Sequence, residues 1–492
     1  MLISRETRTR SNFPADNGGT RLERAIAPAV AAHPGKSGIY PLADSRDAFA
    51  ARILLARDAE RSLDLQYYIW RKDLSGTLLF QALHDAADRG VRVRLLLDDH
   101  GSFGIDDTLA ALDAHPNIEV RLFNPVSIRS PRWIGYLTDF LRLNRRMHNK
   151  SFTADNQAAI VGGRNVGDEY FGAAEGVLFV DLDVLAVGPV VEEISVDFDR
   201  YWHSASAFPL GRLLPSADSA RLAELASAAL GIESDPAAEK YMSALRNAPI
   251  VRELIEGCLT LEWAATQAVS DDPAKVLGLA AAEVNLPEKL KQIIGEPASE
   301  VLLVSAYFVP TAAGVDAFVA MADRGVAVRV LTNSLEATDV VPVHAGYAKW
   351  RKRLLQAGIA ISELRRLSPA RGKRKRKGSF GRSGLSLHAK TFSVDRSRLF
   401  IGSFNFDPRS ANLNTEMGVV IDSPALAKRI AKFCENRISA NAYHVGLSET
   451  GGLCWIENRP GEVIRHDTEP GTSLWRRAGV RLLSLFPIEW LL

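Results

Sequence analysis

Residues 87–96 read ADRGVRVRLL, and a near copy, ADRGVAVRVL, occupies residues 322–331. In both copies a glycine separates a polar stretch from an apolar one that is rich in Val and Leu. Glycine commonly follows the last turn of a helix, and short apolar stretches of this kind are typical of buried strands. Each copy therefore predicts the end of a helix followed by a strand, and the repetition predicts a duplicated chain.

An apolar β-type run precedes each copy, at residues 63–70 and 301–309. Strand, helix and strand in this order form a βαβ unit, in which the strands are parallel and helices cover the sheet. We therefore predict an α/β protein with two lobes, each a mixed, largely parallel sheet covered by helices. The predicted parts are a flexible N-terminal segment (1–35), a first lobe (36–205), a helical connector rich in Ala, Leu and Glu (206–295), a second lobe (296–440) and an appendage (441–492).

The composition is that of a globular protein with little net charge. The chain has 492 residues, of which 47% are hydrophobic, and its 60 basic and 58 acidic side chains leave a formal charge of +2. Attraction to phosphate must therefore come from local patches. Three scattered cysteines match no zinc or disulfide spacing, which favours a reducing compartment. We find no secretory signal and no apolar stretch of about 18 residues, so we expect any membrane contact to be peripheral.

A histidine motif with one spacing occurs in each half. The first copy is HNK at 148–150, Asp155 and GGRN at 162–165, and the second is HAK at 388–390, Asp395 and GSFN at 402–405. From each histidine, lysine lies at +2, aspartate at +7, small residues at +14 and +15, and asparagine at +17. One such motif arises by chance in roughly a few sequences per hundred, but two copies in register leave chance below about one in a thousand.

The spacing also predicts local geometry. On a strand, residues i and i+2 share a face, so each motif histidine should point the same way as its lysine. Asp155 and Asp395 lie in expected hairpin turns, and we predict that they hold the turns rather than act as acid or base. The returning strands would then place small residues where the backbone approaches a phosphate closely.

These motifs resemble the phospholipase D superfamily, whose double HxKxxxxD signature they match without a gap. In that family two half-sites meet at a pseudo-dyad; one histidine attacks phosphorus and the other protonates the leaving oxygen. The covalent phosphohistidine divides one difficult displacement into two easier ones. By family habit the resemblance implies His148 as the nucleophile and His388 as the acid, with no metal and no cofactor.

The remaining site residues are assigned by the tasks that this chemistry requires. Five of them are expected to neutralise and hydrogen-bond the nonbridging phosphate oxygens, as Mg²⁺ does in other enzymes: Lys150, Lys390, Asn165, Ser403 and Asn405. A buried carboxylate usually orients the far nitrogen of such an imidazole. The candidates are Asp181 and Glu416, each opening an apolar strand expected beside the histidine of its own half.

Longer segments, at residues 64–70, 162–171, 331–339 and 487–492, resemble the bacterial cardiolipin synthase C branch. That branch transfers a phosphatidyl group to phosphatidylglycerol, and its implied donor is phosphatidylethanolamine. The resemblance implies a phosphatidyltransferase that forms cardiolipin at the cytoplasmic face of the inner membrane. The motifs do not specify the acceptor, so hydrolysis to phosphatidic acid and, less favoured, a metal-independent nuclease or phosphodiesterase remain alternatives.

Several side chains are candidates for contact with substrate or membrane. Arg374 and Lys375 lie in a basic run at residues 371–377 that fits a solvated loop, anionic headgroups or a nucleic-acid backbone. Trp475 lies among apolar residues at helical spacing, which fits docking on the protein core or anchoring at a membrane. Arginines interleaved with aromatic residues at 129–146 also suit a membrane interface. We expect phospholipid substrates and an anionic membrane surface as partners, and no nucleic acid; the oligomeric state is open.

Overall fold

The computed structural model describes residues 11–14, 18–129, 131–173, 177–215, 223, 227, 236–246, 248, 250, 253, 259–366, 384–487 and 489. The chain divides into two compact units. Unit 1 comprises Met1–Ala174, Leu182–Lys289 and Leu413–Val419, and unit 2 comprises Glu175–Asp181, Leu290–Asn412 and Val420–Leu492. Each unit therefore contains one short segment from the half of the sequence that mainly builds the other unit.

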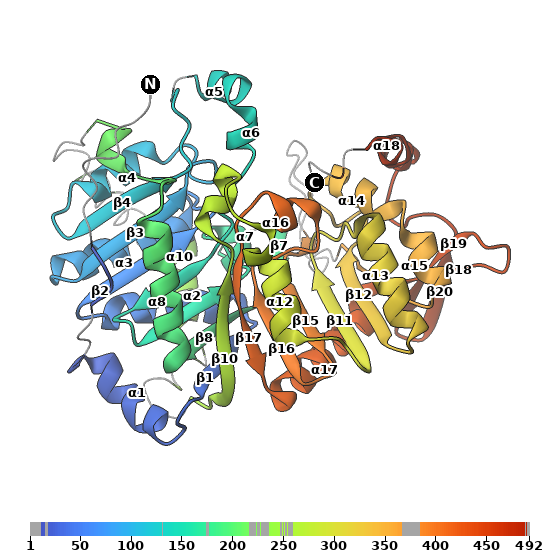
Figure 1. Ribbon diagram of the computed structural model, residues 1–492, viewed down its shortest axis with the longest axis horizontal. Helices are drawn as coiled ribbons and strands as arrows, with labels where there is room; N and C mark the ends of the chain where they lie inside the picture. The colour runs from blue at the N-terminus through green and yellow to red at the C-terminus, as the bar shows by residue number, and fades with distance from the viewer. Residues whose placement is uncertain are drawn as a thin grey trace. The chain divides into compact units, whose positions relative to one another are not determined.

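Unit 1 is an α/β layer structure (Figure 1). Its strands are β1 (Ser37–Leu42), β2 (Ser62–Tyr67), β3 (Arg92–Asp98), β4 (Ile118–Phe123), β5 (Ser151–Ala154), β6 (Ala158–Gly162), β8 (Asp183–Val187), β9 (Ala207–Pro209) and β10 (Glu262–Ser270). Its helices are α1 (Arg21–Ala31), α2 (Ser45–Asp58), α3 (Leu74–Asp88), α4 (Asp106–Asp113), α5 (Arg132–Thr138), α6 (Phe140–Leu143), α7 (Asp168–Phe171), α8 (Pro189–Trp202) and α10 (Pro236–Arg246), with short 3₁₀ turns η1 (Leu210–Arg212), η2 (Pro273–Leu277) and η3 (Ala282–Val284).

The sheet of unit 1 has the order β10-β1-β8-β6-β5-β2-β3-β4-β9. Strands β2, β3 and β4 are parallel, as the βαβ pattern predicted, and the other neighbours are antiparallel. Helix α8 packs its apolar face on this sheet, where Phe198 and Trp202 join Leu96, Phe123 and Met147 in one buried cluster. The segment that leads to the first motif histidine is therefore fixed in the core.

Unit 2 repeats this plan. Its strands are β7 (Val177–Val180), β11 (Glu300–Ser305), β12 (Ala327–Asn333), β13 (Ala360–Leu364), β14 (Gly384–Leu387), β15 (Lys390–Val394), β16 (Arg398–Gly402), β18 (Ala442–Leu447), β19 (Leu453–Arg459) and β20 (Glu462–His466). Its helices are α13 (Thr311–Asp323), α14 (Val341–Ala348), α15 (Arg351–Gln356), α16 (Pro408–Asn412), α17 (Pro424–Asn441) and α18 (Leu474–Ser484); α12 (Leu286–Ile294) and β17 (Met417–Asp422) have residues in both units.

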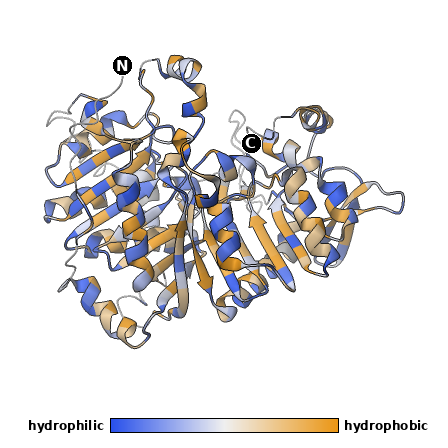
Figure 2. Ribbon diagram, in the orientation of Figure 1, coloured by the Kyte–Doolittle hydropathy of each residue, from blue (hydrophilic) through white to orange (hydrophobic). Residues whose placement is uncertain are grey.

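The main sheet of unit 2 has the order β16-β15-β11-β12-β13-β18-β19-β20, and β7 pairs in parallel with β14 in a separate two-stranded sheet. The parallel strands β11, β12 and β13 correspond to β2, β3 and β4 of unit 1. Figure 2 shows the strands of both units as mainly hydrophobic and the helices as mixed, as expected for helices that cover a sheet.

The two copies of the ADRG segment adopt the predicted conformation. Helices α3 and α13 end at the aspartate of this segment, and the glycines that follow, Gly90 and Gly325, have φ angles of +92° and +86°. This left-handed region is strained for other residues and accessible to glycine. The glycine is therefore required at the point where each helix turns into its strand.

The motif aspartates close two equivalent hairpins. Asp155 and the next residue both have φ angles of +51°, and Asp395 and the next residue have 52° and 48°, which is the pattern of two-residue hairpin turns. The Asp155 carboxylate accepts the backbone N–H groups of residues 60–62, and the Asp395 carboxylate accepts those of residues 298–300. Each aspartate therefore ties its hairpin to the beginning of the first parallel strand of its unit.

Three parts of the predicted organisation need correction. The 206–295 connector contains β9 and β10, because the segment Glu262–Ser270 alternates between buried and exposed residues and pairs with β1. Residues 441–492 are not a separate appendage, because β18 pairs with β13 and covers its exposed backbone edge. The N-terminal 35 residues include helix α1, which the Thr20 side chain caps.

No helix within the described ranges is long and apolar enough to cross a bilayer. Helix α18 instead packs along unit 2 through Val480, which joins Leu335 and Ala345 in a buried cluster. Its opposite side is apolar and exposed, with Trp475 83% and Leu485 80% accessible. The sequence left open whether this helix docks on the protein or faces a membrane, and the contacts of Val480 show that one side docks.

We predict that the Asp395 carboxylate stabilises the fold in a pH-dependent way. Partial burial opposes its ionisation, but hydrogen bonds from the backbone N–H groups of residues 298–300 outweigh burial and lower its pKa from 3.8 to about 2. Because the folded-state pKa is the lower one, this stabilisation is complete above about pH 4 and is lost as the pH falls through about 2. Asp395→Asn should lower the thermal unfolding midpoint at neutral pH, and the difference from the parent should shrink towards pH 2.

The matched control is Asp467→Asn, since that side chain is 77% exposed and pairs with the exposed Arg465. It should change the unfolding midpoint little at any pH. A difference for Asp395→Asn that stays constant from pH 7 to pH 2 would contradict the assigned role of the ionised carboxylate.

Candidate active site

In unit 1 the histidine of the first motif is held by the segment Leu413–Val419. The backbone N–H of His148 donates to the carbonyl oxygen of Thr415 at 2.8 Å. Its Nδ1 lies 2.8 Å from Oε2 of Glu416, which is fully buried, and the ring of Tyr68 lies edge-on at 5.1 Å. A buried carboxylate therefore orients the ring through Nδ1 and leaves Nε2 as the other nitrogen.

In unit 2 the histidine of the second motif is held in the same way by the segment Glu175–Asp181. The backbone N–H groups of His388 and Ala389 both donate to the carbonyl oxygen of Val180, at 2.8 and 3.0 Å. The Nδ1 of His388 lies 2.5 Å from Oδ2 of Asp181, and the ring of Phe179 packs at 5.0 Å. The pairing of β7 with β14 places this carboxylate, because β7 ends one residue before it.

The structure corrects the expected pairing of acids and histidines. The sequence predicts Asp181 beside His148 and Glu416 beside His388, because each acid follows the histidine of its own half. Instead each acid belongs to the unit of the other histidine. The reason is the exchange of segments: the chain passes into the opposite unit for the few residues that carry the acid.

The motif lysines lie beside their histidines, although not on a shared strand. Strand β5 begins at Ser151, after His148 and Lys150, and His388 lies between β14 and β15. Each lysine turns its Nζ towards the carbonyl oxygen of its own histidine. In unit 2 the Nζ of Lys390 also lies 3.0 Å from Nδ1 of the histidine. Both ammonium groups are buried, so each site carries a cation that water screens little.

A polar residue missed in the sequence holds the backbone just before each histidine. In unit 1 the carboxylate of Asp98 accepts the N–H of Met147 at 2.9 Å. In unit 2 the Asn333 amide accepts the N–H of Leu387 at 2.9 Å and donates to its carbonyl at 2.8 Å. Both residues end a parallel strand two positions after the repeated segment, so aligning the two repeats past residues 96 and 331 could have identified them.

Unit 1 contains a further positioning residue, Asp271. It exchanges backbone and side-chain hydrogen bonds with Glu416: its N–H donates to the Glu416 carbonyl at 3.0 Å, and its Oδ2 accepts the Glu416 N–H at 2.9 Å. Lys275 pairs with it at 2.9 Å. Burial raises the pKa of Asp271 to about 6 despite this partner. No motif marks the residue, because its task is to hold one short segment from far along the chain.

The predicted phosphate-binding side chains are buried in their units. The Asn165 amide oxygen accepts the N–H of Ile69, and its nitrogen donates one hydrogen to the Tyr170 hydroxyl. The Asn405 amide oxygen accepts no hydrogen bond from a described residue, and Ser403 is fully buried. At residue 162 a side chain would also clash with Asp183, so the packing of unit 1 requires a glycine there. Arg374 and Lys375 lie outside the described residues.

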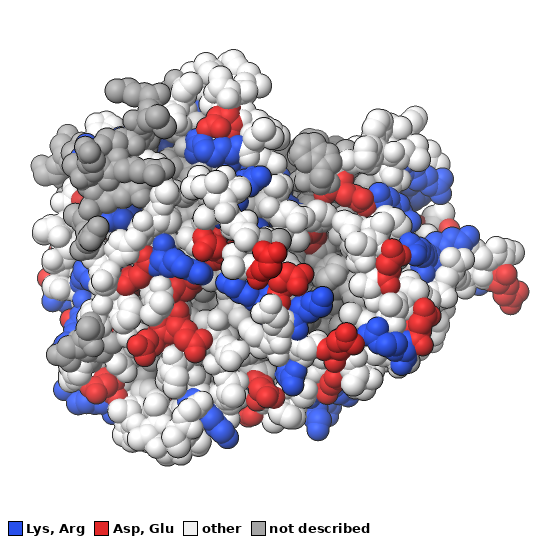
Figure 3. Space-filling view, in the orientation of Figure 1, with Lys and Arg blue, Asp and Glu red and all other residues white. Residues whose placement is uncertain are grey.

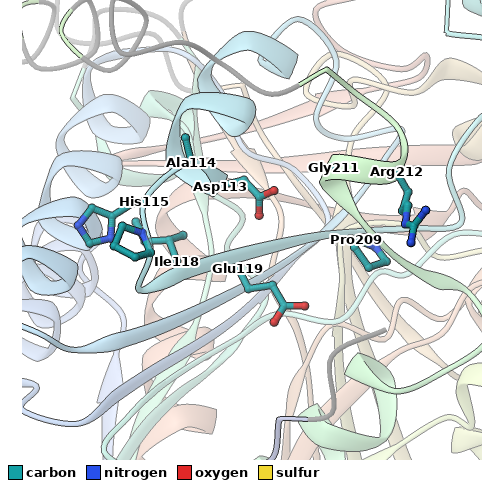
Figure 4. A pocket seen from close by; sticks show the side chains of 9 residues that line it. Asp113, Ala114, His115, Ile118, Glu119, Pro209, Gly211 and Arg212 are labelled. Carbon is teal, nitrogen blue, oxygen red and sulfur yellow. The ribbon is translucent and has the colours of Figure 1, made fainter. Parts of the chain in front are cut away.

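Two other features of unit 1 contain no motif residue. A hollow of about 490 Å³ opens between α4, β4 and η1 and is lined by Asp113, Glu119 and Arg212, among others (Figure 4). Burial raises the pKa of Asp113 to about 6. Within the described residues, the group whose ligand atoms lie close enough to hold a metal ion is His84, Asp85 and Asp88, near the end of α3. Neither feature includes a histidine or lysine of the motifs.

The family comparisons agree with this geometry. A family model described as "Cardiolipin synthase, PLD-like domain" matches residues 53–202 and 290–438. The chain is 50% identical over 475 residues to "Cardiolipin synthase C" of Escherichia coli (strain K12), covering 96% of this chain and 100% of that protein. The chain therefore belongs to the cardiolipin synthase family of phospholipase D-like proteins. This confirms the family and the two phospholipase D-type repeats that the motifs predicted.

More distant relatives extend the likeness. The chain is 25% identical over 364 residues to "Cardiolipin synthase B" of Shigella flexneri, covering 74% of this chain and 71% of that protein. Among solved structures, it is similar to a phosphatidylserine synthase of Haemophilus influenzae Rd KW20, with a TM-score of 0.58 and 13% identity over 96% of this chain and all of that one. At this identity the second likeness concerns the fold alone.

The crossed pairing predicts which imidazole responds to which acid. In protein labelled with ¹⁵N at histidine, Glu416→Gln should move the ring signals of His148 and leave those of His388 in place. Asp181→Asn should do the opposite. Losing an orienting carboxylate should also lower turnover by at least about a hundredfold. The ring signals are assigned with the His148→Ala and His388→Ala variants. If Glu416→Gln moved the signals of His388 and left those of His148 in place, the pairing would be wrong.

Proposed function

We propose that the protein is a phosphatidyltransferase that forms cardiolipin from phosphatidylglycerol and a second phospholipid, either phosphatidylethanolamine or phosphatidylglycerol. The observation that carries the proposal is the pair of motif histidines, each with Nδ1 against a buried carboxylate and a buried lysine beside it. Half the residues are identical to those of a protein named cardiolipin synthase C, over nearly the whole chain.

In the first step, the Nε2 atom of His148 attacks the phosphorus of the donor lipid. Glu416 accepts the Nδ1 hydrogen, so the neutral ring presents its lone pair at Nε2. The bond between phosphorus and the headgroup oxygen breaks, and protonated His388 gives its Nε2 hydrogen to that oxygen. Ethanolamine or glycerol leaves, and a phosphatidyl group remains on the first histidine.

In the second step, the neutral imidazole of His388 takes the proton from a glycerol hydroxyl of phosphatidylglycerol. The resulting oxygen attacks phosphorus, the bond from phosphorus to Nε2 of His148 breaks, and cardiolipin forms. Both rings return to their starting protonation states, so no proton is gained or lost over the cycle. Asp181 stabilises the imidazolium form of the acid throughout.

The growing negative charge on the nonbridging oxygens needs fixed donors. We assign this task to Lys150 and Lys390, whose buried ammonium groups interact strongly in the absence of water. Asn165 can donate the second hydrogen of its amide nitrogen, and Ser403 and Asn405 supply further polar groups. Asp155 and Asp395 keep the structural task described above.

Burial of the histidines favours transfer over hydrolysis. Only 9% of His148 and 7% of His388 is exposed, so bulk water reaches the phosphohistidine poorly. A lipid acceptor bound in the site then competes well with water. Hydrolysis to phosphatidic acid is the alternative product of the same intermediate, and a nuclease activity would require the same histidines to accept a different backbone.

Mixed vesicles of phosphatidylethanolamine and deuterated phosphatidylglycerol should yield deuterated cardiolipin when incubated with the protein in EDTA and read by mass spectrometry. His148→Ala and His388→Ala should each lower turnover by at least about ten-thousand-fold, because each ring performs a step that the other cannot. Asp467→Asn serves as a surface control. If phosphatidic acid were the main product, the activity would be hydrolysis and not transfer. If single-stranded DNA were cleaved while the lipids stayed intact, the activity would be that of a nuclease.

A donor with a p-nitrophenol leaving group distinguishes the two histidines. Such a leaving group needs no acid, so in the His388→Ala variant His148 should still attack the phosphorus of this donor. The second step should then fail, because no base takes the proton from the acceptor hydroxyl. The phosphatidyl group should accumulate on the peptide that contains His148. Its appearance on residue 388 in the His148→Ala variant instead would reverse the assignment.

We further propose that α18 contacts an anionic membrane surface from the cytoplasmic side. Its exposed side carries Leu474, Trp475 and Leu485, and the Arg477 guanidinium donates to the carbonyl and hydroxyl oxygens of Thr472. Apolar side chains combined with arginines suit the boundary between headgroups and acyl chains. Arg374 and Lys375 would add to the same attraction.

The contribution of α18 should depend on salt. Each arginine near an anionic surface contributes about 1 kcal/mol, so Arg477→Ala with Arg481→Ala should weaken binding to phosphatidylglycerol vesicles about thirtyfold at low salt. The loss should shrink above about 0.5 M salt because of screening. Arg465→Ala, at an exposed ion pair on β20, is the control; equal losses for both variants would contradict a specific role of α18.

A further inference from the structure

Helices α5 and α6 of unit 1 present an apolar surface to solvent. Trp133 is 62%, Leu137 74% and Leu141 77% exposed, and Phe140 is 46% exposed. Trp133 and Leu137 are four residues apart and lie on the same side of α5. We call these four side chains the α5–α6 tip. Large apolar side chains gathered in this way are costly in water and indicate a partner surface.

The inner side of these helices is fixed closely to the unit. Gly135 faces Val126 so closely that a side chain at this position would clash with it at 2.4 Å. The backbone N–H of Val126 in turn donates to the buried carboxylate of Asp99 at 2.8 Å. The inner side of the tip is therefore packed against unit 1.

The arginines around this base are held by acids of the protein. Arg129 bonds to Asp99 at 2.8 Å and to Asp106 at 2.7 Å, and Arg132 bonds to Asp106 at 2.5 Å. Arg132 also covers the ring of Phe103 at 4.2 Å. The sequence suggested these arginines for lipid headgroups, but ion pairs with buried or half-buried aspartates leave them little attraction for an external anion.

The same holds on the side of α6. Arg142 pairs with Asp139 at 2.6 Å, and the buried Arg146 pairs with Asp98 at 2.7 Å. Figure 3 shows this end of unit 1 as an uncharged cap with acidic and basic side chains below it. The surface around the tip is therefore apolar and nearly neutral, in contrast to the arginine-bearing α18.

Aromatic rings connect the tip to the motif histidine of the same unit. The Tyr136 hydroxyl on α5 lies 2.5 Å from Nδ1 of His100. His100 stacks near Tyr68 at 6.5 Å, and Tyr68 packs on His148 at 5.1 Å. Successive side-chain contacts thus link helix α5 to the ring of His148.

We propose that the α5–α6 tip inserts into the hydrocarbon boundary of a phospholipid bilayer and positions unit 1 to receive a lipid at His148. This rests on the proposed function in one respect, that the substrate is a membrane lipid. The tip acts by burying apolar surface, not by attracting anionic headgroups. An exposed tryptophan at its edge suits the zone where hydrocarbon meets headgroups.

A bilayer fits these observations better than a protein partner. The tip is short, with side chains that project from two brief helices, and four arginines at its base, Arg129, Arg132, Arg142 and Arg146, are paired with carboxylates of the protein, which leaves them little charge to orient a protein partner. A bilayer makes no such demand, because it accepts apolar side chains in any rotation about its normal.

The test measures binding without turnover, in a His148→Ala background. The variant that also carries Trp133→Ser, Leu137→Ser and Leu141→Ser should bind sedimenting vesicles at least about tenfold more weakly. The loss should be equal on phosphatidylcholine vesicles and on vesicles with phosphatidylglycerol, and it should persist in 0.5 M salt. Because no product is measured, failure to form cardiolipin would reject the proposed function and leave this result standing.

Leu279→Ser with Val463→Ser removes comparable exposed apolar side chains elsewhere and should leave vesicle binding unchanged. Unchanged binding of the triple variant would overturn the proposal. A loss of binding confined to anionic vesicles at low salt would also overturn it, because such a loss would indicate electrostatic attraction and not apolar insertion. A change of oligomeric state on gel filtration with unchanged vesicle binding would also overturn it, in favour of a second copy of the chain as occupant.

A second measurement follows insertion directly. Brominated acyl chains should quench part of the tryptophan fluorescence of the bound protein, and the Trp133→Phe variant should lose that part while it still binds, because phenylalanine keeps the apolar contact. Equal quenching in both proteins would place Trp133 outside the bilayer and overturn the proposal.

Discussion

The structure of each half-site depends on a carboxylate that comes from the other half of the sequence. Glu416 meets His148 across 268 residues, and Asp181 meets His388 across 207 residues. A carboxylate on Nδ1 sets the tautomer, the ring orientation and the reacting nitrogen together. Duplication alone would give two similar lobes; the exchange of two short segments makes each histidine dependent on the whole chain.

The exchanged segments are held by ordinary backbone interactions used in different ways. In unit 2 the segment forms a strand, β7, that pairs with the strand ending just before His388. In unit 1 the segment lies across Asp271, whose backbone and carboxylate bond to Glu416 on both sides. The burial that raises the pKa of Asp271 shows how deep this support lies. Neither arrangement involves a side chain of the histidine motif. The position of each acid is therefore set by the strand pairing of β7 and by the hydrogen bonds of Asp271, not by the motif.

The sequence predicted what is local and repeated, and failed where distant segments meet. The helix end at Gly90, the turn at Asp155 and the parallel strands follow from short patterns with known backbone preferences. The two acids could be named from the sequence, because each precedes an apolar strand. They could not be matched to their histidines, because pairing between segments far apart in the chain leaves no local pattern. Strand β10 was missed for a related reason. Its alanines show little alternation between polar and apolar residues in the sequence, and its buried and exposed positions follow from its pairing with β1.

The two half-sites also differ, and the proposed chemistry requires a difference. One imidazole has to begin neutral and the other protonated, and identical surroundings would favour the same state in both. Glu416 is a longer acid held by Asp271, whereas Asp181 lies closer to its ring and shares it with the ammonium group of Lys390. Two copies of one motif can therefore take different roles, because the carboxylates that orient the two imidazoles differ in length and in their own partners.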